Sequence, residues 1–350
     1  MKDGMFIFDA VIHAFDLRAS NARTPVADAH VNWMKAVVTA WSSETNPGNP
    51  RLRVGRLDDV QEAVEMFENS DTDMAMVQTV PLMDYWQDGL SPADLQAQFA
   101  AAMPEQILFC GGVDPLQQGV RGACAEMERQ VKELGARSFK FYQAQSRHLA
   151  WKADDRALVY PLYEKALELG IDYIQFHKGG VIGDQRMEDL RSLDIQGAAL
   201  DFPQLTFGLH HLGFPYVDET FAVASQHSNV VLVLPLWFNQ YMVQPRRMIE
   251  ILGKALFEIG PDRLLYGSEA FLWPNVQTFI DMFNGLEMPE DLQDGYGYPA
   301  LTREIKEQIF GLNAARVLGI DVEKKKAELE KLSAGTLKKL STPETAGVAV

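Results

Sequence analysis

The sequence predicts a single (β/α)8 barrel, a TIM barrel, because eight short runs rich in β-branched and aromatic residues alternate with longer amphipathic segments. The runs are expected as strands at residues 6–13, 72–80, 106–113, 137–142, 171–177, 205–211, 230–236 and 263–267. Helical segments lie between them, among others at residues 57–69, 122–134, 158–169 and 247–259. Strands separated by helices form a parallel sheet, and eight such units favour closure into a barrel.

An open, doubly wound sheet is the alternative architecture for this alternating pattern. Such a sheet usually carries a glycine-rich phosphate loop directly after its first strand. Here the first strand-like run continues into Ala14, Phe15 and Asp16 without the G-x-G-x-x-G spacing. The barrel is therefore the favoured fold.

Two segments lie outside the repeat. Residues 21–56 form a long polar excursion with Pro47, Gly48 and Pro50, which predicts a loop and a short helix over the barrel mouth. The barrel domain is expected to span residues 1–320. Residues 321–350 are expected to form a helix at 323–332 and then a mobile tail rich in Ser, Thr and Gly.

Charge and cysteine content narrow the class of protein. The 350 residues carry a formal net charge of -16, and the pI is about 4.9. Such a surface repels phosphate backbones and anionic lipid, which argues against nucleic-acid and membrane-surface roles. No stretch of about 18 apolar residues and no signal-peptide core is present. Cys110 and Cys124 form no C-x-x-C pair and no disulfide framework, so we expect a soluble, reduced, cytoplasmic protein.

Three histidines end predicted strands: His13 the first, His177 the fifth and His211 the sixth, while Glu269 follows the eighth. The carboxyl ends of all barrel strands meet at one mouth, so these side chains should converge there. Imidazoles and a carboxylate suit Zn²⁺, Fe²⁺ or Mn²⁺. Taken singly, a histidine at a strand end is more often structural; the coincidence of all four favours a metal site.

The remaining histidines are interpreted as structural or surface residues: His30, His148, His210 and His227. His210 precedes His211, and the period of two along a strand predicts that its side chain points into the helix layer.

Several motifs, in their order and spacing, resemble a known family. They are DAVIH at 9–13, GARSFKFY at 135–142, YPLYE at 160–164, FHKG at 176–179, FPQL at 202–205, HLG at 211–213 and DRLLYGSE at 262–269. Over residues 6–320 the chain resembles the metal-dependent, amidohydrolase-related family typified by aminocarboxymuconate-semialdehyde decarboxylase. Homo-oligomers are common in that family, which implies a homo-oligomer here.

The resemblance implies roles for particular residues. Family members bind one metal ion through a D-x-H-x-H pair, a fifth-strand histidine and an eighth-strand aspartate, and a sixth-strand histidine is the acid/base. His13 and His177 then correspond to metal ligands and His211 to the acid/base. Val11 stands where the first histidine of the pair belongs, and Glu269 replaces the aspartate. The two histidines and one carboxylate left still suit one divalent ion, zinc, iron or manganese; a vestigial site is the alternative.

Three further residues are candidates for contact with substrate. Lys140 ends the fourth strand and could hold an anionic substrate or serve as a carboxylated ligand, as in some related barrels. Trp237 and Trp273 follow the seventh and eighth strands and could wall an apolar or aromatic pocket. The alternative for all three is packing at the barrel rim.

Two classes of function follow. The leading hypothesis is metal-assisted hydrolysis or non-oxidative decarboxylation of a small organic acid, amide or aromatic carboxylate, with His211 moving the proton. The other is an accessory protein of the same fold that binds metal or a partner without turnover. The Val11 variant and the GSEAFLWP run at 267–274 resemble relatives encoded beside bacterial di-iron hydrocarbon monooxygenases, which implies an oxygenase subunit as partner.

Overall fold

Eight parallel strands form one sheet in the order β1-β4-β5-β6-β7-β8-β9-β10 in the computed structural model, which describes residues 1–54, 56–145 and 149–341. Their bounds are β1 Phe8–Ile12, β4 Met74–Gln78, β5 Ile107–Gly111, β6 Ala136–Phe141, β7 Tyr173–Phe176, β8 Thr206–His210, β9 Val230–Val233 and β10 Leu264–Leu265. A parallel bridge between Ile12 and Ala270 joins the first strand to the chain after the last. The predicted TIM barrel is confirmed.

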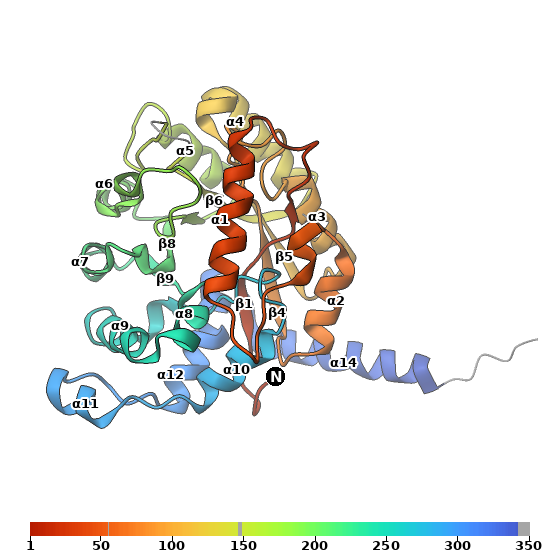
Figure 1. Ribbon diagram of the computed structural model, residues 1–350, viewed down its shortest axis with the longest axis vertical. Helices are drawn as coiled ribbons and strands as arrows, with labels where there is room; N and C mark the ends of the chain where they lie inside the picture. Colours follow the sequence, from red (N-terminus) through yellow and green to blue (C-terminus); the bar gives the residue numbers. More distant parts are fainter. Residues whose placement is uncertain (55, 146–148, 342–350) are drawn as a thin grey trace, which may run out of the picture.

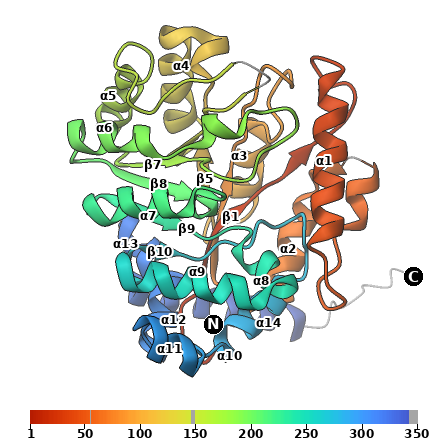
Figure 2. The same cartoon turned by 60° about the vertical axis from the view of Figure 1, so that its left-hand side comes forward.

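Helices surround this barrel (Figures 1 and 2). Those that follow or connect the strands are α2 Val60–Glu68, α3 Ala93–Ala102, α4 Pro115–Lys132, α5 Tyr160–Glu168, α6 Leu193–Asp201, α7 Val217–Gln226, α8 Trp237–Val243, α9 Pro245–Glu258, α10 Val276–Gly285, α11 Glu290–Tyr296, α12 Arg303–Glu307 and α13 Asn313–Val317. Two short strands, β2 Phe15–Asp16 and β3 Arg56–Leu57, pair antiparallel outside the barrel.

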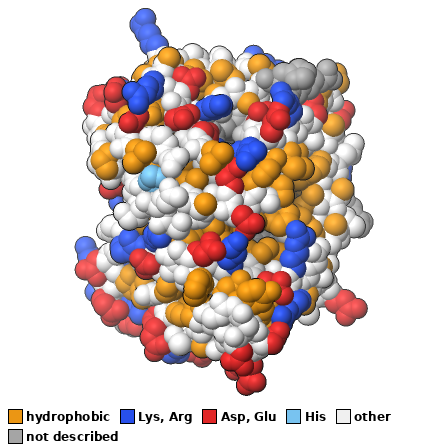
Figure 3. All heavy atoms as spheres, turned by 90° about the vertical axis from the view of Figure 1, so that its left-hand side faces the viewer, with side chains coloured by type: hydrophobic (Ala, Val, Ile, Leu, Met, Phe, Trp, Pro, Cys, Tyr) orange, Lys and Arg blue, Asp and Glu red, His pale blue; other side chains and the backbone are white. Residues whose placement is uncertain are grey.

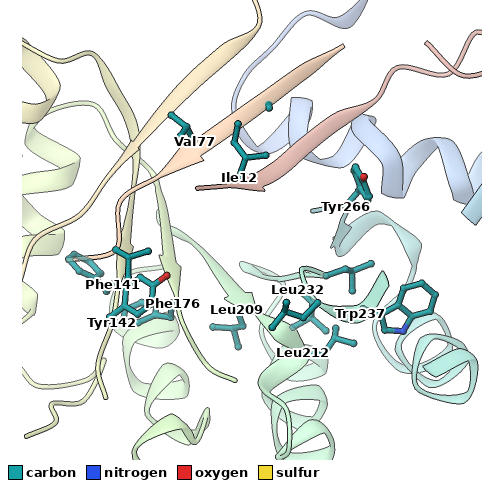
Figure 4. Close-up of a cluster of buried hydrophobic side chains, with 14 of the residues drawn as sticks. Ile12, Val77, Phe141, Tyr142, Phe176, Leu209, Leu212, Leu232, Trp237 and Tyr266 are labelled. Atoms are coloured by element: carbon teal, nitrogen blue, oxygen red, sulfur yellow. The ribbon is translucent and has the colours of Figure 1, made fainter. Parts of the chain in front are cut away.

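The alternation of side chains along each strand produces two apolar cores. Outward-facing residues of successive strands pack with the helices in the larger core, and Figure 4 shows part of it: Ile12, Val77, Phe141, Phe176, Leu209 and Leu232. Residues of opposite parity, such as Met74 and Met76 on β4 and Val231 and Val233 on β9, form a second cluster inside the barrel. Because this interior cluster fills the barrel's lower part, polar side chains are left for its carboxyl-terminal end.

The excursion at residues 21–56 holds a longer helix than predicted. Helix α1 spans Val26–Ala40 and stands beside the barrel (Figures 1 and 2). Its Trp33, Met34 and Val37 line the same cavity as His13 at the end of β1. The excursion therefore forms one wall of the barrel mouth.

The C-terminal segment extends away from the barrel as helix α14, Val322–Ser341 (Figure 1). This helix continues past residue 333, where the mobile tail is predicted to begin; residues 342–350 lie outside the described part of the chain. Within the described residues, no helix combines the length and the apolar character that a membrane span requires. Figure 3 shows acidic and basic side chains interspersed with apolar ones over one face of the molecule.

Candidate functional site

The carboxyl ends of the strands surround a cavity of about 50 Å³. His13, His177, His211 and Glu269 all line it, so the structure brings the four predicted residues to one place. The rest of the lining is Phe15, Trp33, Met34, Val37, Val80, Leu90, Tyr142, Gly180, Ile182, Leu236, Leu272 and Trp273. A few polar groups in an otherwise apolar, concave site are typical of a small-molecule binding site.

His13 follows β1 and is held in one tautomer. Its Nδ1 lies 2.8 Å from the carbonyl oxygen of Gln78 at the end of β4, so Nδ1 carries the proton and donates it. The other nitrogen, Nε2, has no hydrogen-bond partner among the described residues and lies 3.6 Å from Oε1 of Glu269. Burial lowers the pKa of His13 well below its usual value, so the ring is neutral and Nε2 presents a lone pair.

Glu269 reaches the same point from the chain after β10. Its backbone has a φ of 63°, in the left-handed region that non-glycine residues rarely adopt, and its amide donates to the carbonyl of Val11 at 3.0 Å. Such backbone strain clusters at functional sites. Its Oε2 has no hydrogen-bond partner among the described residues. Burial raises the pKa of Glu269 to about 7, although the charge of Lys140 acts in the opposite direction.

His177 and His211 form a second pair. Nε2 of His177 donates to the carbonyl of Gly180 at 2.9 Å, and Nδ1 of His211 donates to the carbonyl of Pro235 at 3.2 Å. The two remaining nitrogens, Nδ1 of His177 and Nε2 of His211, face each other at 3.1 Å. Burial lowers the pKa of both rings, to about 3 for His177. Two neutral rings therefore direct lone pairs at each other, an arrangement that a shared proton or a metal cation satisfies.

The four side chains are of types that bind a divalent metal ion, but in this structure they lie too far apart to enclose one. No group of three or more His, Cys, Asp or Glu side chains encloses a common point suited to a metal in the part of the chain that the structure describes. The two pairs, His13 with Glu269 and His177 with His211, face one cavity separately. Neutral imidazole nitrogens and a carboxylate without partners are ligands for zinc, iron or manganese. Binding one ion to both pairs requires them to approach each other.

A buried polar network supports the cavity from inside the barrel. Lys140 on β6 is fully buried, and its ammonium lies 2.9 Å from Nδ1 of His210, whose Nε2 donates to Oε1 of Gln175 at 2.8 Å. Gln175 also accepts from the side chain of Gln78 at 3.1 Å. Burial lowers the pKa of Lys140 to about 8, against the attraction of Glu269. Lys140 is not among the cavity-lining residues; it places a positive charge beneath the site.

The prediction that His210 points into the helix layer is wrong. His210 ends β8 and lies inside the barrel, bonded to Lys140 and Gln175. Strict alternation would then turn His211 outward. His211 instead adopts a φ of 58°, and the left-handed turn continues at Leu212 with a φ of 53°. The strand has ended, so both histidines face inward at successive levels, and the period of two no longer applies.

The two tryptophan candidates lie in different places. Trp273 lines the cavity, is fully buried and stacks on Trp41 with ring centroids 6.4 Å apart. Trp237 does not line it: its Nε1 donates to the carbonyl of Met248 at 2.9 Å, and its ring stacks on Tyr241. Trp237 is therefore part of the helix layer, as in the rim-packing alternative.

Sequence reasoning missed three contributions to the site. The backbone carbonyl of Gln78 fixes the ring of His13, and the ring of Tyr142 stacks on His177 with centroids 4.8 Å apart. Helix α1 supplies three apolar wall residues. Tyr142 ends the predicted fourth strand, as His177 ends the fifth. Its position in the sequence therefore indicated that Tyr142 lies at the barrel mouth. The carbonyl of Gln78 had no signal in the sequence.

Of the other histidines, His30 on α1 is fully buried, accepts a hydrogen bond from Nε1 of Trp86 at 3.1 Å and stacks on Tyr85. His227 follows α7 and is half-buried, and His148 lies outside the described residues.

His30 should make stability fall in acid. Burial lowers its pKa to about 4 from 6.5, so the folded state favours the neutral ring. The stability that this provides is present above pH 6.5 and is lost as the pH falls towards 4. Between pH 7 and 4.5, the loss of unfolding free energy should be about 2–3 kcal/mol smaller in His30→Gln than in the unchanged protein. Urea unfolding at both pH values measures this; equal losses would contradict it.

Comparison with known proteins agrees with the fold and the motifs. The model of the Amidohydrolase family matches residues 27–320. An uncharacterised TIM-barrel protein from Bordetella bronchiseptica is similar in structure, with a TM-score of 0.64, 20% identity, and 90% of this chain and 99% of that chain covered. No curated protein matches the chain.

Two further similar structures are of enzymes or their relatives. One is 5-carboxyvanillate decarboxylase from Novosphingobium aromaticivorans, complexed with manganese and 4-hydroxy-3-methoxy-5-nitrobenzoic acid, with a TM-score of 0.57, 14% identity, and 91% and 97% of the two chains covered. The other is an amidohydrolase from Burkholderia multivorans with bound zinc, with a TM-score of 0.56, 15% identity, and 90% and 100% covered. The family match confirms the resemblance and the predicted enzyme class: the chain belongs to the amidohydrolase family.

Proposed function

We propose that the chain is a metal-dependent enzyme that decarboxylates or hydrolyses a small organic acid, aromatic carboxylate or amide. The observation that carries this proposal is the convergence of His13, His177, His211 and Glu269 on one cavity at the carboxyl ends of the strands. Active sites of TIM-barrel enzymes lie at this end. The manganese-bound decarboxylase and the zinc-bound amidohydrolase share the fold, and they support a divalent metal here.

His13, His177 and Glu269 are the residues that would hold the metal. Each offers an uncharged nitrogen or a carboxylate oxygen on the cavity side, and carbonyl groups behind the two histidines fix their tautomers. When bound, a divalent ion supplies Lewis-acid polarisation of a substrate oxygen. Glu269 supplies a negative charge that offsets part of the ion's charge, while Lys140 keeps a positive charge beneath the cavity.

His211 is the residue proposed to move the proton. The carbonyl of Pro235 holds its Nδ1, so Nε2 is the atom free to accept a proton, and the neutral ring is in the correct state to do so. In hydrolysis Nε2 would take a proton from the attacking water. In decarboxylation Nε2 would first take a proton from the acid substrate or from water and would then deliver that proton to the carbon that loses carbon dioxide. The apolar walls exclude bulk water, which strengthens the electrostatic interactions in the site.

The proposed activity is tested by loading the purified protein with zinc, iron or manganese in turn. Aromatic carboxylates and amides are then screened for release of carbon dioxide and for hydrolysis products. Turnover of one substrate class, lost on chelation and restored by the metal, is the expected result. Turnover that is unaffected by complete chelation, or no turnover with any metal, would contradict the proposal.

A second candidate function, a non-catalytic accessory protein, is favoured by a specific observation. Val11 removes one ligand of the family's site, and the described side chains enclose no three-ligand site. In that case the chain would bind a partner, such as a di-iron oxygenase subunit. Capture experiments with purified oxygenase subunits test this: a stable complex combined with no turnover would favour it, and metal-dependent turnover without a complex would exclude it.

A further inference from the structure

The loop at residues 266–273, here called the β10 loop, supplies three side chains of the cavity. They are those of Glu269, Leu272 and Trp273. Strand β10 ends at Leu265, so the regular hydrogen-bond ladder of the barrel sheet stops before Glu269. Contacts outside that ladder must therefore fix the position of the Glu269 carboxylate.

Strand β1 and the residue that follows it hold the first half of the β10 loop. Three hydrogen bonds do so: the amide of Ser268 to Oδ1 of Asp9 at 2.9 Å, the amide of Glu269 to the carbonyl of Val11 at 3.0 Å, and the amide of His13 to the carbonyl of Ala270 at 2.6 Å. These bonds end at Ala270, so Phe271 and Leu272 depend on a restraint from another part of the chain.

Asn49, in the excursion between α1 and α2, supplies that restraint. Its amide donates to the carbonyl of Leu272 at 2.9 Å, and its side-chain Nδ2 donates to the carbonyl of Phe271 at 3.0 Å, across 222 residues of sequence. Nδ2 also donates to Oε2 of Glu62 on α2 at 2.6 Å, and Oδ1 accepts from the amide of Arg51 at 2.9 Å. Every polar group of the Asn49 side chain is therefore used.

Glu62 fixes Asn49 from behind. Both side chains are buried, and the Glu62 carboxylate also accepts from the guanidinium of Arg51 at 3.2 Å. An aspartate at position 49 would bring a carboxylate oxygen against the carboxylate of Glu62 and the carbonyl of Phe271, and an alanine would leave both without their donor. The position therefore calls for an amide side chain.

The backbone of Glu269 depends on restraint from both sides. Its φ of 63° is unfavourable for a residue with a side chain and persists only where the surrounding structure over-determines it. The amide of Leu272 donates back to the carbonyl of Glu269 at 3.3 Å, so the hold that Asn49 has on Leu272 reaches Glu269. Oε1 of Glu269 lies 3.6 Å from Nε2 of His13, and a relaxed backbone would move it away.

We infer that Asn49 is a positioning residue for the candidate site: by holding the carbonyls of Phe271 and Leu272, it keeps the carboxylate of Glu269 beside Nε2 of His13. Asn49 does not line the cavity, so it acts only through the β10 loop. The inference rests on the proposed function in treating Glu269 as a metal ligand. It also gives the excursion at residues 21–56 a role beyond the wall that α1 forms.

Hydrogen exchange of the full-length protein without metal tests the restraint itself. In Asn49→Ala, the amide of Glu269 should exchange at least about tenfold faster than in the unchanged protein, while amides of β7 exchange as before. The matched control is Asn229→Ala. Asn229 precedes β9, at the barrel end opposite the cavity, and its Nδ2 likewise donates to backbone carbonyls, those of Ala199, Phe202 and Leu205. Unchanged exchange at Glu269 in Asn49→Ala would overturn the inference.

The affinity for Mn²⁺, measured by titration with detection of the free ion, tests the consequence for the site. Asn49→Ala should weaken binding by about 10- to 100-fold, as is typical when a residue that orients a ligand is lost, and Asn229→Ala should leave it unchanged. In a Glu269→Gln background, Asn49→Ala should have no further effect, because the ligand that it positions is already lost. Equal losses in both backgrounds would show a general structural role and overturn the inference.

A milder variant and the unchanged protein complete the experiment. Asn49→Ser keeps a short side-chain donor and should shift exchange and affinity in the same direction by less, which preserves the test if Asn49→Ala does not fold. An unchanged protein that binds no Mn²⁺ would contradict the proposed function, and the exchange rates would still decide the role of Asn49. Tight binding of Mn²⁺ by the unchanged protein and equally by both Asn49 variants would support the metal site and overturn the inference.

Discussion

Replacement of His211 by asparagine is expected to lower turnover by about 10²- to 10⁴-fold, the range typical of a lost acid/base group. Asparagine can keep the hydrogen bond to the carbonyl of Pro235 that His211 makes in this structure. It cannot accept and release a proton at the position of Nε2. The measurement is kcat and KM of the metal-loaded variant on the substrate found in the screen, and the loss should fall on kcat.

The matched control for this change is His227→Asn. His227 follows α7 and does not line the cavity, so the same substitution there should leave kcat unchanged. Circular dichroism should show the same fold in both variants. A His211→Asn enzyme with kcat within about threefold of the original would remove His211 from the role of acid/base.

Replacement of Asp194 by asparagine should destabilise the protein by about 3–5 kcal/mol, because it leaves a buried positive charge without its partner. The ammonium of Lys178 has no solvent-exposed side-chain surface and donates to Oδ1 of Asp194 at 2.5 Å and to the carbonyl of Arg191 at 2.7 Å. The other oxygen of Asp194 accepts from Gln143 at 2.5 Å and from the amide of Ala153 at 2.8 Å. Urea unfolding measures the loss.

An exposed ion pair provides the comparison. Asp218 pairs with Lys254 at the surface, where 85% of the Asp218 side chain is accessible, so Asp218→Asn should change the unfolding free energy by less than about 1 kcal/mol. The double variant Lys178→Met with Asp194→Leu should recover part of the loss, because neither charge then remains buried. Equal effects of Asp194→Asn and Asp218→Asn would show that the Lys178 pair is not buried in solution.

The strands could be predicted well because their side chains carry a local signal. Runs such as residues 230–236 are apolar at every position, as expected for strands covered on both faces, and each predicted run overlaps a barrel strand. The positions of His13, His177 and Glu269 at strand ends follow directly, since the barrel places all such ends at one mouth.

The details of the site depend on contacts between distant parts of the chain. The ring of His13 is fixed by the carbonyl of Gln78, and His210 is held by Lys140, 70 residues away in the sequence. Neither pairing leaves a pattern in the sequence. The error for His210 has a local cause: alternation holds only within a strand, and a left-handed residue at His211 ends it. The cavity wall that α1 forms likewise depends on how the long excursion at residues 21–56 folds back against the barrel.

The central claim is that His13, His177 and Glu269 bind one divalent metal ion at the barrel mouth. Elemental analysis of protein purified without added metal or chelator tests it most directly, alongside the His13→Ala/His177→Ala double variant. The account predicts about one zinc, iron or manganese ion per chain, absent from a variant that remains folded. Lack of metal in both proteins, persisting after reconstitution with each of the three ions, would contradict it.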